Sequence, residues 1–312
     1  MKKLFKSNEF IFLFLPIIVL IIIGLILESL KFKYTTQFVL ICGPILSAFV
    51  ALYISSNVAY KAQLYSKEKN KSLLKHVTVI LEESIKTANL ERSNYQEFIS
   101  DLKNKGIEQI WLKTTPFHFF KVISNFNKQE LFDAIRSYDS KRFDLNEVYI
   151  KIVNDAENSL FIKSNAEQQY IRFIESFNRA GENWKRGQLE LNQLYGEIDT
   201  SPTHAPFDGA YKGAIQNYTL LVRQGKINEY MINDIRANLS LPLEQVLQTH
   251  FFQHHYISQF QQTLKIVNMG LDKMEEIHNY IIVHLTGLIS DLDLILTRLE
   301  SAVKELKEMQ TT

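Results

Sequence analysis

The most apolar part of the chain consists of two hydrophobic runs near the N-terminus. They are FIFLFLPIIVLIIIGLIL (10–27) and FVLICGPILSAFVALYI (38–54), and neither contains Asp, Glu, Lys, Arg or His. About 20 apolar residues in a helix cross the roughly 30 Å hydrocarbon core of a bilayer. The pattern predicts a transmembrane hairpin over 1–56, in which ESLKFKYTTQ (28–37) connects the spans. The first run is too long for a typical signal-peptide core, and no small-x-small cleavage motif follows it.

After the second run, apolar residues recur at spacings of three and four, which predicts helices rather than strands. We expect 57–90 to form a juxtamembrane stalk helix and 91–196 to form a helical cytoplasmic domain. Asp144 and Ser164, each followed by Glu three residues later, are typical of helix starts. The stretch EIDTSPTHAPFDGAYKG (197–213) contains two Pro and two Gly, which predicts a loop. This loop would be a connector between helical layers, or alternatively a mobile lid over a ligand.

The C-terminal region, 214–312, has the most regular pattern. A seam with gaps of three and four runs through about nine heptads without a break, which is typical of a coiled coil. The seam consists of Leu243, Val246, His250, Gln253, Ile257, Phe260, Leu264, Val267, Leu271, Met274, His278, Ile281, Leu285, Leu288, Leu292, Ile295, Leu299, Ala302 and Leu306. Ser240 with Pro242 predicts a helix start. The predicted fold is all-α: a transmembrane hairpin, then a cytoplasmic helical bundle that ends in a long coiled-coil-like helix.

The distribution of lysines predicts how the hairpin is oriented. The positive-inside rule compares the N-terminal tail (Lys2, Lys3, Lys6) and the stretch after the second run (Lys61, Lys67, Lys69, Lys71, Lys75) with the connector (Lys31, Lys33). It places both termini of a multi-pass membrane protein in the cytoplasm. The reversed topology is the alternative, because the connector is not free of positive charge.

Small residues recur every four positions in the second run, at Gly43, Ser47, Ala51 and Ser55. Positions four apart share one face of a helix, and small residues let another helix approach closely. The face would pack against the first span of the same chain, or against copies of itself around a symmetry axis. In the second case these residues, with Pro44, would line a pore.

Composition narrows the functional classes. The chain has 312 residues and a formal net charge of +1, so no global field favours nucleic acid or cations. Its one cysteine, Cys42, lies in the second run, which excludes disulfides within the chain and cysteine zinc sites. Neither run contains an ionisable residue of the kind that proton relays and coupled transporters need.

Two stretches are candidate sites. Residues 111–143 combine aromatic residues with cations that would hold a nucleotide, such as a signalling nucleotide, or an oligonucleotide. The five candidate ligand-binding residues among them are Lys113, Lys121, Arg136, Lys141 and Arg142. Acidic residues dilute this stretch, so aromatic core packing is the favoured interpretation. His250 and His254 have the i, i+4 spacing of metal ligands, but no motif completes a site. The chain has no nucleotide-binding, hydrolase or metalloprotease motif, so we expect no enzymatic activity, cofactor or metal.

The order of parts is MKKLFKSNEF, two closely spaced apolar runs, a lysine-rich stalk and a long helical region. This order resembles bacterial two-transmembrane abortive-infection effectors, which disturb the inner membrane when a cytoplasmic sensor domain triggers them. The resemblance is one of architecture, and no functional residue is carried over from it. It implies an anti-phage effector that acts on the lipid bilayer as a homo-oligomer.

Three functional hypotheses follow. The first is a gated pore, assembled through the second span and the C-terminal helix and controlled by a ligand or a cytoplasmic partner protein. The second is a membrane-anchored coiled-coil scaffold that recruits such a partner, with the hairpin as a passive anchor. The third, an enzyme held at the membrane, would need a catalytic cluster in or near 197–213.

Overall fold

The computed structural model describes residues 18–19, 21–26, 28–30, 35–105, 110–138, 144–202, 205–251 and 255–311. The chain divides into two compact units, Met1–Ser72 and Leu73–Thr312. Within the described residues every regular element is a helix, which confirms the all-α prediction.

The first unit contains the two hydrophobic runs. Residues 18–19 and 21–26 of the first run are helical, and the rest of that run lies outside the described residues. The second run lies within α2 (Thr35–Lys105), a helix of 71 residues that continues past the boundary between the units. The pairing of the two runs as a transmembrane hairpin therefore stays a prediction.

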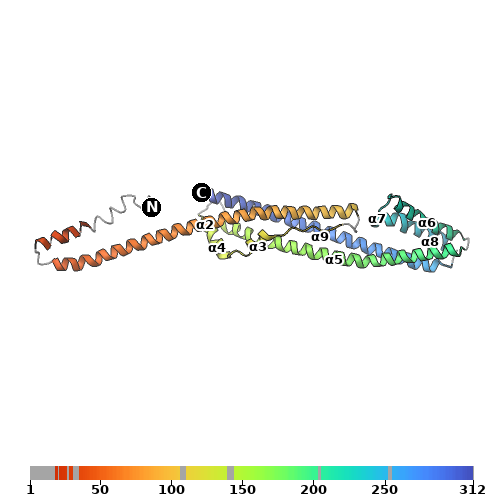
Figure 1. Cartoon of the computed structure of the whole chain (residues 1–312), viewed down its shortest axis with the longest axis horizontal. Coiled ribbons are helices and arrows are strands. Elements are labelled where there is room, and N and C mark those ends of the chain that lie inside the picture. The colour runs from red at the N-terminus through yellow and green to blue at the C-terminus, as the bar shows by residue number, and fades with distance from the viewer. Residues whose placement is uncertain are drawn as a thin grey trace. The chain divides into compact units, whose positions relative to one another are not determined.

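Three long helices form the frame of the second unit: α2 from Leu73 onward, α5 (Leu145–Thr200) and α9 (Ile257–Thr311) (Figure 1). Ion pairs show that α9 is antiparallel to both of the others. Glu82 of α2 pairs with Lys307 at 2.6 Å, while Arg92, further along α2, pairs with Asp293 at 2.8 Å.

The buried pairs between α5 and α9 follow the same antiparallel direction. Asp155 of α5 accepts two hydrogen bonds from Arg298, at 2.9 and 2.7 Å, and Glu190 accepts one from Thr263 at 3.0 Å. The Asp155 side chain is 4% exposed, and this burial raises its pKa although Arg298 acts in the opposite direction.

Two glycines bring α5 and α9 into close contact. A Cβ at Gly270 would lie 2.9 Å from the backbone nitrogen of Trp184, and one at Gly187 would lie 2.6 Å from Cγ2 of Val267. Side chains larger than hydrogen do not fit at such separations, so glycine sets the distance between the helices here.

Two hydrophobic cores follow one another along the α5–α9 pair. The first is formed with α2, an extended segment at 110–117, α3 (His118–Ser124) and α4 (Lys128–Arg136). We call residues 110–117 the strap. Ile110, Leu112 and Phe117 of the strap are buried in the first core.

The second core is formed with α6 (Pro206–Arg223), α7 (Ile232–Ile235), a π-helical turn η1 (Arg236–Ser240) and α8 (Leu241–His250). The rings of Phe207, Tyr211 and Phe260 form its centre, with centroid separations of 5.1 to 5.8 Å. The buried Tyr211 hydroxyl donates to the carbonyl of Leu191 at 2.7 Å. Burial raises the pKa of Tyr211.

The C-terminal seam is confirmed as a core face, although not as one helix. Every predicted seam position from Ile257 to Leu306 is buried except His278, which is half-buried. The helical path ends at His250 and begins again at Ile257, so α8 and α9 are separate helices. Ser240 is the N-cap residue of α8 and Pro242 lies in its first turn, as predicted, although η1 leads into α8 without a break in the helical path. The Leu241 N–H bonds to the carbonyl of Arg236, five residues back.

Of three other predicted boundaries, one is confirmed and two are corrected. Asp144 caps α5 as predicted, because its side chain accepts from the backbone N–H groups of residues 146 and 147. Ser164 starts no helix and lies within the continuous α5. The loop predicted over 197–213 is wrong as drawn, since α5 extends to Thr200 and α6 begins at Pro206. Proline is favoured in a first turn because no N–H is needed there.

The C-terminal boundary of the predicted stalk, 57–90, is also corrected, because its later residues belong to the first core. Leu74, Val77 and Leu81 have no exposed surface and pack in the first core. The exposed part of α2 that follows the second run is therefore confined to residues 57–72.

Candidate functional site

The small residues of the second run lie on an exposed face of α2. Gly43, Pro44, Ser47, Ala51 and Ser55 are all exposed, and a Cβ built at Gly43 meets nothing within 4 Å. The Ser47 hydroxyl donates to the carbonyl of Pro44 at 2.8 Å, so its proton has an acceptor within the same helix. Such local bonding lets a serine face lipid or a neighbouring helix without an unpaired donor.

The five cations weighed as a nucleotide site do not form a described cluster. Lys141 and Arg142 lie outside the described residues. Lys113 pairs with Glu97 at 2.7 Å, and Arg136 lies over the Phe132 ring at 5.9 Å. Lys121 is exposed on α3, so the three described cations belong to the strap, α3 and α4.

The aromatic residues of the same stretch support core packing. Phe117 is 3% exposed and Phe120 is fully buried, with ring centroids 5.0 Å apart. Trp111 and Phe119 are exceptions, with 78% of Trp111 exposed on the strap and 39% of Phe119 exposed on α3.

A buried ionic cluster, absent from the sequence predictions, fastens the strap to α2 and α5. The Glu91 side chain has no exposed surface, and its Oε2 accepts the backbone N–H of Thr115 at 2.5 Å. Lys163 of α5 donates to the Thr115 carbonyl at 2.7 Å and lies 3.7 Å from Glu91 Oε1. One acid and one base therefore hold both backbone groups of a single strap residue.

One tyrosine, Tyr95, lies near this cluster. Burial raises the pKa of Tyr95, and the nearby Glu91 carboxylate adds to the effect. Glu91 falls on a seam with the three-four spacing of Ala88, Tyr95 and Phe98, and that spacing is the signal that would have found it. A charged residue on an apolar seam needs a partner, which here is Lys163.

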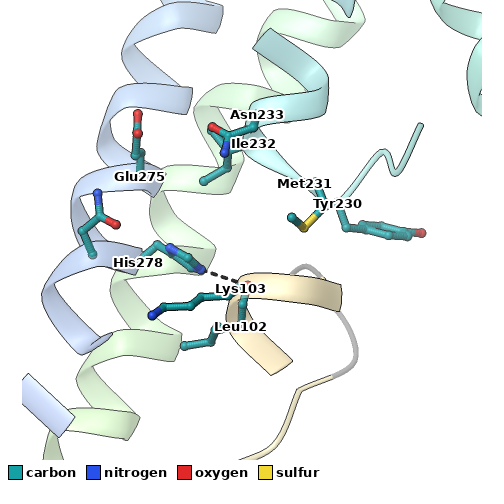
Figure 2. Close-up of a pocket in the computed structure, with 9 residues that line it drawn as sticks. Leu102, Lys103, Tyr230, Met231, Ile232, Asn233, Glu275 and His278 are labelled. Atoms are coloured by element: carbon teal, nitrogen blue, oxygen red, sulfur yellow. Dashed lines mark hydrogen bonds between the residues drawn. The ribbon is translucent and has the colours of Figure 1, made fainter. Parts of the chain in front are cut away.

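A cavity of about 170 Å³ lies where the first core meets the second (Figure 2). Its walls come from the C-terminal end of α2, the turn before α7, the start of α7, and α9. Nine residues line it: Leu102, Lys103, Tyr230, Met231, Ile232, Asn233, Glu275, His278 and Asn279. Typical ligand pockets enclose roughly 300–1,000 Å³, so this cavity fits a group smaller than a nucleotide.

Side chains beside the cavity hold the C-terminal end of α2. His278 Nε2 lies 3.1 Å from the carbonyl of Leu102, and Asn228 Nδ2 donates to that of Lys105 at 3.1 Å. Because a carbonyl only accepts, Nε2 carries the proton in this contact. The last carbonyls of a helix lack partners within the helix, so these bonds fix the end of α2 to α9 and to the turn before α7.

The histidine pair weighed as a metal site is not supported as one. The His250 ring packs against Phe207 at a centroid separation of 6.5 Å, while His254 lies outside the described residues. Within the described part of the chain, no group of three or more His, Cys, Asp or Glu side chains is placed to hold a metal.

In the described part of the chain, one helix, α9, is long and apolar enough to cross a membrane, with a mean hydropathy of 1.5 in its most apolar window. One third of that window (33%) is buried inside the structure. The α9 seam packs against α5, as a core helix of a bundle does, so α9 is weak support for membrane association.

The comparisons with known proteins give no relative: no family model, curated protein or solved structure matches this chain.

Proposed function

We propose that this chain is an oligomeric membrane effector in which the second hydrophobic run lines a gated pore. One observation carries the proposal: α2 contains both that run and part of the core of the second unit, from Leu74 to Leu102. A ligand or partner that changes how α2 packs in the second unit acts on the same helix that bears Gly43 and Ser47.

The exposed small-residue face supports self-association. Four small residues spaced by four make a smooth surface that an identical helix can approach closely. Because a single hairpin encloses no path, conduction would require several copies. The inner-membrane location, the cytoplasmic termini and the role in anti-phage defence rest on the lysine distribution and the architectural resemblance.

Gating needs a trigger with different affinities for the closed and open states. The C-terminal end of α2, beside the cavity, is the candidate point of control, because side chains from distant parts of the sequence hydrogen-bond to its last carbonyls. The small volume of the cavity favours a partner protein over a signalling nucleotide as the trigger.

A matched pair of variants tests the assembly. Ser55 and Ser56 are adjacent and both exposed. At 100° per residue, Ser55 lies on the small-residue face, whereas Ser56 lies nearly opposite the centre of that face. We expect Ser55→Leu to shift the detergent-solubilised protein from oligomer to monomer in light scattering, and Ser56→Leu to leave the oligomer intact. Equal behaviour of the two variants would remove the packing face from the account.

The scaffold hypothesis is the second candidate, and exposed apolar residues on α9 favour it. Tyr280, Val283 and Leu294 are 58%, 71% and 57% exposed, which suits a surface for a cytoplasmic partner. Replacing residues 1–56 with an unrelated membrane hairpin separates the two candidates. A scaffold keeps its function after the exchange, whereas a pore loses it.

A further inference from the structure

Residues 57–72 of α2 carry a local excess of positive charge. The segment has four lysines, at 61, 67, 69 and 71, but only one carboxylate, Glu68, whereas the whole chain is almost neutral at +1. The chain has no charged residue from the start of the second hydrophobic run to Tyr60, so Lys61 is the first charge after that run.

Three of these lysines have no partner among the residues that the structure describes. Lys61, Lys67 and Lys71 are exposed and make no ion pair or hydrogen bond with any described residue. At 100° per residue they fall within an arc of about 120° around the helix. Lys67 and Lys71 are also four residues apart, a spacing at which like charges repel, so a nearby anion would stabilise the helix.

Exposed apolar and aromatic side chains lie just before Lys61 and between Lys61 and Lys67. Val58 and Tyr60 are each 61% exposed, Leu64 is 44% exposed and Tyr65 is 73% exposed. Tyrosine and lysine together are typical of the membrane–water interface, where rings sit at headgroup level and ammonium groups reach the phosphates.

A second copy of the chain is a poor occupant for this segment. Lys69 points to a different side of the helix from Lys71, so parallel copies packed here would bring lysines close to lysines. An anionic surface has the complementary charge. Lys71 is ten residues after Lys61, about 15 Å along the helix axis. Long lysine side chains, and a screening length of about 10 Å for the attraction, let both ammonium groups interact with the same headgroup layer.

We propose that residues 57–72 bind the headgroup layer of an anionic membrane, with Lys61, Lys67 and Lys71 contacting lipid phosphates. The inference rests on the proposed membrane anchoring and adds a lipid class to it. Anionic lipid would then hold residues 57–72 at the membrane surface and limit how far from that surface Leu73, the first residue of the second unit, lies.

The test is lysine acetylation of the full-length protein in nanodiscs, where both membrane faces are accessible. One set contains only phosphatidylcholine and the other adds one quarter phosphatidylglycerol. Phosphatidylglycerol should slow acetylation of Lys61, Lys67 and Lys71 about threefold or more, and salt should reverse the effect. The reference lysines, exposed and without an ion pair, are Lys185, Lys226 and Lys265, whose rates should not change.

Two results would overturn the inference. Equal rates in the two lipid mixtures would show that the lysines do not bind anionic headgroups. Equal slowing by inorganic phosphate in phosphatidylcholine discs would show binding of an ion rather than of lipid. Incorporation into both kinds of disc without protection would remove the headgroup inference alone, whereas failure to enter either disc would also contradict membrane anchoring.

Variants give an independent readout. In discs assembled from mixed lipids, the wild type should enrich phosphatidylglycerol among its co-purified lipids. The triple variant Lys61→Gln, Lys67→Gln, Lys71→Gln should lose this enrichment. The matched triple variant at Lys185, Lys226 and Lys265 removes the same charge from the second unit and should keep it. Equal enrichment in both triple variants would contradict the proposed surface.

Discussion

Replacing Gly270 with alanine tests the close approach of α5 and α9. The added Cβ would lie 2.9 Å from the backbone nitrogen of Trp184 and 3.4 Å from two atoms of Asn183. Backbone atoms of a packed helix cannot move aside cheaply, and overpacking of this kind costs about 1–3 kcal/mol. Alanine also favours the helix by about 1 kcal/mol over glycine, so the net loss should be up to about 2 kcal/mol.

Gly287→Ala is the matched control, because Gly287 lies on the same helix, is exposed and has nothing within 4 Å of a built Cβ. This variant should gain up to about 1 kcal/mol from helix propensity alone. The difference between the two variants isolates the steric cost. Urea unfolding of both, followed by circular dichroism at 222 nm, measures that difference. Equal midpoints for Gly270→Ala and Gly287→Ala would refute the close approach.

Three further predictions concern the described contacts. Glu91→Gln should weaken the buried contact with the strap by about 1–3 kcal/mol and speed hydrogen exchange at the Thr115 amide. Glu97→Gln, at the exposed ion pair with Lys113, should cost under about 1 kcal/mol. Similar exchange rates at the Thr115 amide in both variants would count against the cluster. Burial raises the pKa of Tyr218 to about 12, above its unfolded value of 10.0. The native state therefore retains the proton that the unfolded state loses, and stability should fall as the pH rises from 10 to 12, by up to about 1.4 kcal/mol per pH unit. The tyrosinate absorbance of Tyr218, taken as the difference between wild type and Tyr218→Phe, should then appear with unfolding, and its appearance in the fully folded protein near pH 10 would contradict the buried site. His278→Leu should cost about 1 kcal/mol and speed exchange in the last turn of α2, because a carbonyl there loses its donor; unchanged exchange would show that the contact does not hold the helix end.

The helical class and the core seam were predictable because they depend on local periodicity. From Ile257 to Leu306, each seam position alternates by three or four, and burial follows that alternation with one exception. The break between α8 and α9 was not predictable, since the seam keeps its register across it. Pro206 is predicted within a loop, but it begins α6, because proline is favoured in the first turn of a helix as well as after its end.

Contacts between distant segments account for what the sequence did not predict. Glu91 meets the strap only because α2 and α5 lie side by side, and nothing local to Glu91 names Thr115 or Lys163 as its partners. The cavity likewise needs the end of α2 beside the turn before α7, more than 100 residues later in the sequence. The small-residue face was predicted from spacing alone and stays a prediction, because Leu52 and Ile54 on other sides of the same helix are exposed as well.

Ion flux through liposomes that contain the purified protein tests the pore most directly. Wild type, Ser47→Leu, Ser55→Leu and Ser56→Leu would be compared at equal protein incorporation, alone and with lysate from infected cells as a source of the trigger. The account predicts flux for wild type and Ser56→Leu, and its loss in the two variants that fill the small-residue face. Equal flux in all four proteins, or none from any of them with the trigger present, would contradict a pore lined by this face.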